Sequence, residues 1–191
     1  MTVKRFARWC VSGLAIALTL AALPTLPGTA QTREGLTIWG GVDADRRLPY
    51  RLFNNEPRST RAHYHLRVPA NHVDRALSDL QIIYPDAFNE YNGRFNLEDD
   101  NIRVYRGRND RGEEIEIDEV VWTPEANRLD IYLLEQIPQD TYFTVVLRHV
   151  RNPDRALQQP FGLYAPSPGA PLNTIVGIWN LSLGYEDGRN N

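Results

Sequence analysis

Three of the four histidines in this chain, His63, His65 and His72, lie close together in the sequence. His63 and His65 are two positions apart, so on a β-strand their side chains would project from the same face. Two imidazoles on one face can hold a copper or zinc ion, and His72 would have to fold back to become a third ligand. The alternative is that His63, His65 and Arg67 form the solvated stripe of a half-buried strand, since no further histidine or cysteine lies nearby to complete a coordination shell.

A second group with catalytic potential is the acidic series Glu114, Glu116 and Asp118, which alternates with apolar residues. Carboxylates two positions apart on a strand are about 7 Å apart, within the separation of roughly 5–9 Å at which carboxylate pairs hydrolyse glycosides. A hydrolase would hold these groups in a concave pocket. The alternative is an exposed strand face that Arg128 neutralises from a neighbouring strand. We favour the exposed face, because any acidic stripe on a strand has the same spacing.

Other recognisable chemistry is missing from the sequence. The acidic turns at residues 99–101 and 109–114 do not space their oxygen atoms as a calcium-binding loop does. No serine lies in a G-x-S-x-G motif, and neither a G-x-G-x-x-G nor a P-loop sequence is present. We therefore expect no cofactor, and a non-enzymatic protein rather than an enzyme.

The first thirty residues have the three-part layout of a secretory signal peptide. Three basic residues precede an apolar run over residues 10–26, and small residues follow at 28–30. The alternative, a membrane anchor, is less favoured because Pro24 interrupts the run before it reaches the ~20 residues of a spanning helix. We expect export by the Sec route to the periplasm or medium, cleavage after Ala30, and membrane contact only through this transient leader.

Removal of the leader changes the composition of the working protein. Residues 31–191 contain 18 basic and 24 acidic residues, a net charge of −6. Lys4 is the only lysine of the chain and Cys10 its only cysteine, so thiol catalysis, cysteine–zinc sites and lysine Schiff bases are excluded from residues 31–191. An acidic chain with interspersed arginines also disfavours nucleic acid as a partner. We expect an envelope component or another exported protein instead.

Short segments of alternating or continuous apolar character, separated by turn residues, run through the rest of the chain. About eight to ten strands at this spacing predict an antiparallel β-sandwich with immunoglobulin-like layering, with a partly open β-barrel as the alternative. We expect one domain over residues 31–185, at most one short helical turn, after Asn71, and a flexible polar tail at 186–191. The predicted strands cover residues 36–39, 48–53, 62–68, 80–84, 102–105, 114–122, 129–133, 142–150, 161–164 and 175–183.

An ordered series of short motifs resembles a family of exported cyanobacterial proteins known only as a domain of unknown function (twenty-eight-oh-eight). The motifs are Ile137-Pro138 with Thr141, the valine-rich strand that ends in Arg151-Asn152-Pro153, Phe161-Gly162-Leu163, Pro168-Gly169, and Val176-Gly177-Ile178-Trp179. Asp140 stands where the family has glycine, and residues 154–160 replace a tyrosine-rich segment. The resemblance spans roughly residues 50–184. It implies an exported β-rich protein and carries over no catalytic residue.

Overall fold

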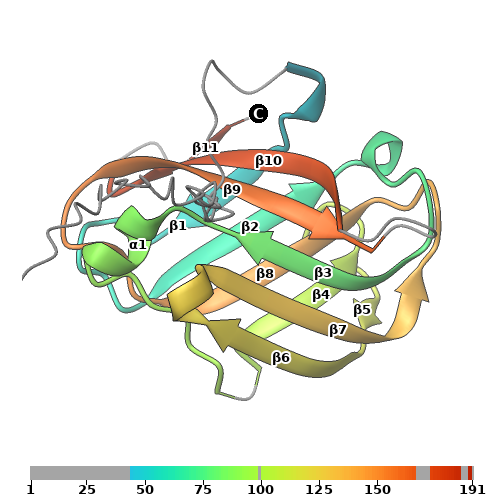
Figure 1. The fold of residues 1–191 in the computed structure, drawn as a ribbon, viewed down its shortest axis with the longest axis horizontal. Coiled ribbons are helices and arrows are strands. Elements are labelled where there is room, and N and C mark those ends of the chain that lie inside the picture. The colour runs from blue at the N-terminus through green and yellow to red at the C-terminus, as the bar shows by residue number, and fades with distance from the viewer. Residues whose placement is uncertain (1–43, 99, 167–172, 186–188, 191) are drawn as a thin grey trace, which may run out of the picture. The chain divides into compact units, whose positions relative to one another are not determined.

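The computed structural model describes residues 44–98, 100–166, 173–185 and 189–190. The predicted leader, its cleavage site and the predicted strand at 36–39 lie outside these residues. Within them, almost all regular structure is β, and the strands form two layers, with sheet A in front of sheet B in Figure 1. No helix of the described residues is long and apolar enough to cross a membrane.

Every strand pair within the two sheets is antiparallel. Sheet A contains, in spatial order, β10 (Thr174–Leu183), β9 (Leu157–Ala165), β3 (Leu77–Ile83), β7 (Arg128–Ile137) and β6 (Ile117–Thr123). Sheet B contains β11 (Arg189–Asn190), β1 (Tyr50–Phe53), β2 (Ala62–Val68), β8 (Phe143–Val150), β4 (Ile102–Arg106) and β5 (Glu114–Ile115). In the described residues no strand joins the two sheets, so the sandwich prediction is confirmed over the barrel.

Alternation of apolar and polar residues explains why β2 lies where it does. Ala62, Tyr64, Leu66 and Val68 are fully buried and face sheet A. The residues between them face away from the core, and the predicted strand at 62–68 has the same bounds as β2. A half-buried strand with a period of two therefore sets the orientation of the histidines.

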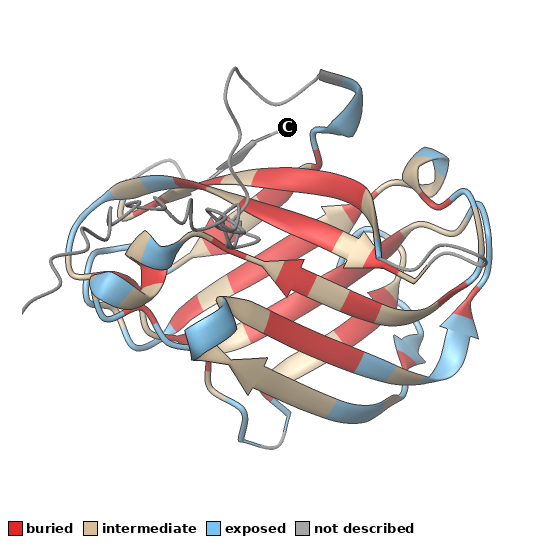
Figure 2. Ribbon diagram, viewed as in Figure 1, coloured by how far each residue is buried: buried red, intermediate tan, exposed pale blue. Residues whose placement is uncertain are grey.

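The two sheets pack against each other over one apolar core, and Figure 2 shows buried residues along the strands of both sheets. Trp179 of sheet A is fully buried, and its Nε1–H donates to the backbone oxygen of Arg67 in sheet B at 2.9 Å. This bond satisfies the indole nitrogen inside the core and ties the two layers together.

Helical structure in the described residues is limited to the α-helix α1 (Asp86–Glu90) and the single 3₁₀ turns η1 (Ala44–Arg46), η2 (Ala70–His72) and η3 (Pro124–Ala126). Turn η2 lies near the helical turn expected after β2, but it covers Ala70–His72 and begins before Asn71 rather than after it. Helix α1 was not predicted, because five residues are too few for a helical period to show in the sequence. Its Phe88 is fully buried and packs edge-on against Tyr84, with ring centroids 5.2 Å apart. The helix thus closes one end of the core with an aromatic side chain.

The prediction of one continuous strand over residues 114–122 is wrong. The chain leaves sheet B after Ile115, which pairs with Val104, and enters sheet A at Ile117, which pairs with Leu133. Glu116 lies at this crossover, where its backbone oxygen accepts a hydrogen bond from Leu134 N–H. Residues Ile115 and Ile117 both contact the core, so the alternation continues although the sheet changes.

Candidate functional site

The outer face of sheet B, the side turned away from sheet A, carries two of the three predicted histidines. His63 and His65 both point outward from β2, as predicted. His65 pairs with Arg51 of β1 and Val146 of β8, and only 8% of it is exposed. Its ring packs against Phe53, with centroids 5.0 Å apart. Side chains on this face therefore shield one another from solvent around His65.

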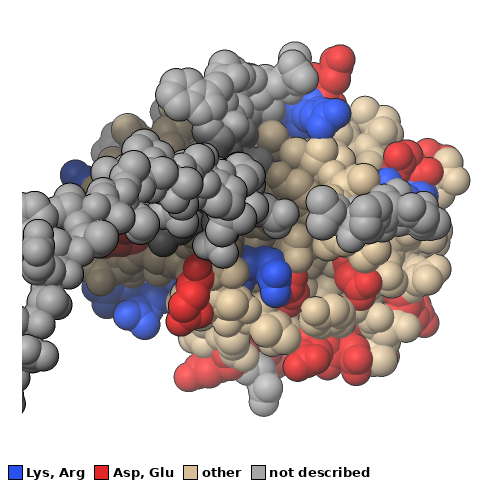
Figure 3. All heavy atoms as spheres, viewed as in Figure 1, with Lys and Arg blue, Asp and Glu red and all other residues tan. Residues whose placement is uncertain are grey.

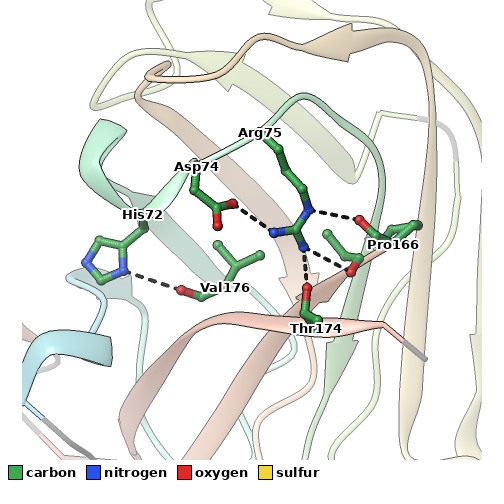
Figure 4. Close-up of polar contacts among 7 residues, drawn as sticks. His72, Asp74, Arg75, Pro166, Thr174 and Val176 are labelled. Atoms are coloured by element: carbon green, nitrogen blue, oxygen red, sulfur yellow. Dashed lines mark hydrogen bonds and ion pairs between the residues drawn. The ribbon is translucent and has the colours of Figure 1, made fainter. Parts of the chain in front are cut away.

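His72 does not join these two histidines. It lies in η2, beyond the end of β2, and its Nδ1 is 3.4 Å from the backbone oxygen of Val176 in sheet A (Figure 4). The same close-up shows Arg75 reaching the loop end of the β9–β10 hairpin, where Nε donates to Pro166 O at 3.0 Å and Nη2 donates to Thr174 Oγ1. These contacts give His72 and its neighbours a role in holding sheet A together.

His149 of β8, rather than His72, lies beside His63. A bulge in the pairing of β2 with β8 gives His149 a positive φ of 51°. Its ring centroid lies 5.5 Å from that of His63. The bulge has no local signature in the sequence, so the contact between His63 and His149 was not predicted. Among the described residues, no group of three or more histidine, cysteine or acidic side chains is arranged to hold a metal.

The loop over residues 107–113, between β4 and β5, brings an acidic group to this face. Gly107 begins the loop with φ of 97°, and its backbone N–H donates to Tyr142 O at 2.7 Å. Its own carbonyl accepts the hydroxyl of the fully buried Thr144 at 2.7 Å. These bonds position Asp110, whose carboxylate lies 3.8 Å from Arg148 Nη2.

Burial and neighbouring charges both act on the pKa values of His63 and His65. Burial lowers the pKa of His63, and the neighbouring His149 and Arg148 lower it further. Burial also lowers the pKa of His65, with smaller contributions from Arg67, His63 and Arg148. Asp110 opposes both shifts but does not cancel them. Both imidazoles are therefore kept neutral by burial and by nearby guanidinium groups.

Arg67 differs from the other arginines with a buried Nε. Four such atoms have no hydrogen-bond partner: those of Arg67, Arg103, Arg106 and Arg151. Three of these arginines also hold a carboxylate in an ion pair, namely Arg103 with Glu114, Arg106 with Glu113, and Arg151 with Asp154. Within the described residues, Arg67 forms no ion pair. Its guanidinium thus has a buried Nε without an acceptor and no carboxylate partner among the described residues.

The predicted acidic stripe is broken up by the crossover between sheets. Glu114 lies on sheet B and accepts two bonds from Arg103 Nη1, at 2.8 and 2.6 Å, whereas Asp118 lies on β6 of sheet A. Glu114 and Glu116 line a shallow hollow of about 290 Å³ that Asp118 does not reach. The expected neutralising partner is also different, because Arg128 pairs with Asp130 at 2.7 Å. The three acids therefore do not share one strand face, and the hydrolase alternative loses the arrangement on which it rested.

Acidic side chains instead gather along the rim of the molecule. Figure 3 views the sheet A side, and its acidic groups concentrate over β6 and β7. Arg106 contacts Glu135 of β7 at this rim and also Glu113 of the 107–113 loop. The charges of the chain are thus separated, with unpaired arginines on the outer face of sheet B and excess acid along the β6–β7 rim.

A second hollow, of about 340 Å³, lies beside the loop after β1 and is lined in part by Asn55 and Tyr185. The amide of Asn55 is fully used, because Nδ2 donates to Ser182 O and Tyr185 O, and Oδ1 accepts Gly184 N–H. Polar groups that satisfy one another offer little to a ligand. At this hollow, Asn55 connects the loop after β1 to the end of β10, and we do not assign it as a binding site.

Two antiparallel sheets packed over one apolar core define this protein as an antiparallel β-sandwich. The model of a family described as "Protein of unknown function (DUF2808)" matches residues 37–183. The chain therefore belongs to this family, as the motif series indicated.

Two solved structures are similar to this chain at low identity. The collagen-binding domain from a Staphylococcus aureus adhesin is 8% identical, with 69% of this chain and 93% of that chain covered and a TM-score of 0.38. An uncharacterised protein from Nocardia farcinica with an immunoglobulin-like fold is 13% identical, with 73% and 99% covered and a TM-score of 0.34. No curated protein matches the chain. At these identities and TM-scores, neither likeness supports a conclusion about function.

Proposed function

We propose that this protein is exported and acts as a non-enzymatic binding module of the cell envelope, with the outer face of sheet B as its recognition surface. The observation that carries the proposal is the Arg67 guanidinium, which has a buried Nε without an acceptor and no ion pair within the described residues. The interior of the sandwich is filled by apolar side chains, Glu114 in one hollow is held by Arg103, and Asn55 in the other is held by backbone groups. Recognition is therefore left to the surface.

Export is supported by the leader-like arrangement of residues 1–30 and by the resemblance to exported cyanobacterial proteins. The absence of cysteine from residues 31–191 means that folding after export needs no disulfide formation. A domain of about 160 residues can bury enough apolar surface to be stable without such cross-links. These features suit a protein that works outside the cytoplasm.

Expression of the full chain with its own leader in a Gram-negative host tests export. We expect the periplasmic fraction to contain a product whose mass corresponds to a chain that begins at Gln31. The control variant Ala30→Glu places a charge at the cleavage position and should retain residues 1–30. A product that keeps Met1 and stays in the cytoplasm would contradict the export part of the proposal.

Binding is tested by mixing the exported protein with isolated cell envelopes and sedimenting them. We expect co-sedimentation of the wild type and its loss in Arg67→Glu, with both proteins equally folded by circular dichroism. If the exported wild type stays in the supernatant, the binding function is wrong.

A further inference from the structure

We infer that the outer face of sheet B binds an anionic polysaccharide, whose carboxylate or sulfate groups lie between Arg67 and Arg148. This inference rests on the proposed binding function and names the class of ligand. It begins from the position of the two guanidinium groups relative to His65. Arg67 follows His65 by two residues on β2, and Arg148 follows Val146, the partner of His65, by two residues on β8.

Because β2 and β8 are antiparallel, the two arginines approach His65 from opposite ends of the face. Of the charged groups near the imidazole of His65, Asp110 acts on its pKa most strongly and Arg67 and Arg148 oppose it, so all three lie within electrostatic reach of the ring. An oxyanion above His65 can therefore meet a guanidinium on each side. Arginine is suited to this role, because its planar fork donates two parallel hydrogen bonds to a carboxylate or sulfate.

Asp110 is the carboxylate of the protein that lies near Arg148, and it does not satisfy the N–H donors of the guanidinium. It lies 3.8 Å from Arg148 Nη2, which is longer than a hydrogen bond. Its side chain is 38% exposed and that of Arg148 31% exposed, so the pair is weakly held and open to solvent. No carboxylate of the described residues pairs with Arg67. A ligand anion would supply the acceptor that this face lacks.

Further cations extend the site into a surface that suits a polymer rather than a single ion. The guanidinium of Arg51 lies 4.5 Å from the ring centroid of Phe53, and that of Arg108 lies 5.4 Å from the ring centroid of Tyr142. Stacking fixes the planes of these groups while leaving their N–H edges available. Within the described residues neither Arg51 nor Arg108 forms an ion pair. Charges spread over β1, β2, β8 and the 107–113 loop match a chain with repeating anionic groups.

Membranes and nucleic acids fit this face less well. The exposed large apolar residues of the described chain are Leu97, Tyr132, Leu134 and Tyr185, none of which lies on a strand of sheet B. A membrane-binding surface usually adds apolar side chains that enter the bilayer interface. A single-stranded nucleic acid needs exposed aromatic rings on which bases stack. On this face the half-buried rings of Phe53 and Tyr142 are covered by Arg51 and Arg108, which favours a polyanion that lacks bases and lipid tails.

The test uses the exported protein and four probes: immobilised dextran sulfate, immobilised polygalacturonate, neutral dextran of matched length, and phosphatidylglycerol vesicles. We expect binding to at least one of the two anionic polymers, weakening as sodium chloride is raised, and no binding to neutral dextran or to vesicles. Arg67→Gln and Arg148→Gln should each weaken polymer binding by about tenfold. Arg67→Lys should restore part of the loss, since it returns the charge without the fork.

Arg58→Gln is the matched control, because it removes the same charge from a side chain that is 74% exposed and contacts Asp154 at the other end of β2. It should change polymer affinity less than about twofold. An equal loss in Arg58→Gln would show general attraction of charge and overturn the site. Binding to vesicles but not to polymers, or to no anionic polymer at all, would overturn the ligand class.

Failure of this inference is distinguishable from failure of the proposed function. If envelopes are bound in an Arg67-dependent way while both anionic polymers are ignored, the ligand class is wrong and the binding function stands. If neither envelopes nor polymers are bound, the binding function itself fails.

Discussion

The hydroxyl of Tyr64 donates a hydrogen bond of 2.5 Å to Oδ1 of Asn152, and both residues are fully buried. Asn152 also donates through Nδ2 to Glu56 O at 3.0 Å and through its backbone N–H to Ser59 O at 2.8 Å. One asparagine thus joins β2 to the loop between β1 and β2. The Arg-Asn-Pro motif that ends β8 is explained by this contact, since a side chain without both a donor and an acceptor cannot replace it.

Loss of this buried bond should destabilise the sandwich. In Asn152→Ala, the Tyr64 hydroxyl and the Glu56 carbonyl lose their partner, and we expect a decrease of about 2–4 kcal/mol in the free energy of unfolding. Tyr64→Phe should cost about 1–2 kcal/mol, because only Asn152 Oδ1 is left without its donor. Urea unfolding measures both. The exposed Tyr132→Phe is the control, and a Tyr64→Phe variant as stable as this control would contradict the role assigned to the bond.

Stability should fall in mild acid because of the histidines on the outer face of sheet B. The pKa values of His63 and His65 in the folded protein lie below the ordinary value of 6.5. The unfolded chain therefore binds more protons than the folded chain as the pH falls through 6.5 toward the folded pKa values. Linkage then requires that the free energy of unfolding decreases over this range.

Thermal unfolding at pH values from 7.5 to 5 measures this effect. In the double variant His63→Gln with His65→Gln, the decrease in melting temperature should be smaller than in the wild type. Parallel curves for the two proteins would show that other groups control the acid response.

Gly177, which belongs to the Val-Gly-Ile-Trp motif of β10, is required by the close approach of Leu48. A Cβ atom at this position would lie 2.6 Å from Leu48 Cγ, and Leu48 is fully buried. Gly177→Ala should therefore lower the free energy of unfolding by about 1–3 kcal/mol through overpacking. Denaturant unfolding compares it with Asn180→Ala on the same strand. Stability equal to that of the control variant would mean that Leu48 can move aside at no cost.

The metal hypothesis for His63, His65 and His72 stays a prediction, and the structure sharpens its test. If the imidazoles of β2 hold copper or zinc, elemental analysis of the purified protein should find the metal, and titration should saturate at about one ion per chain. The double variant His63→Ala with His65→Ala should abolish binding. His72→Ala should leave it unchanged, because that ring lies against Val176 of sheet A. Protein that contains no metal and does not respond to either ion would remove the hypothesis.

Local patterns were sufficient for most strands and for the direction of the side chains on β2. The alternation from Ala62 to Val68 placed His63 and His65 on the outer face, because the orientation of neighbours within one strand depends only on the backbone pleat. The fully buried run at the centre of β8 was also recognisable, since its apolar residues are continuous. Both features belong to segments of fewer than ten residues.

Relations between distant segments were not recognisable in the same way. The alternating series around Glu116 has the pattern of one continuous strand. The pattern would be the same if the chain stayed in one sheet or crossed to the other, because Ile115 and Ile117 contact the core in both cases. The bulge that turns His149 toward His63 arises from the pairing of β8 with β2. Such pairing depends on contacts across the whole sandwich.

The sequence by itself determined the residue types available for chemistry, the β-sandwich class and the outward direction of His63 and His65. These follow from composition and from a period of two, which are local properties of the chain. Only the tertiary structure decided that His149 and not His72 lies beside His63, that the acidic series is divided between two sheets, and that Arg67 lacks a carboxylate among the described residues. Those outcomes depend on which strands become neighbours, and strand pairing is selected by burial of the complete core rather than by any single segment.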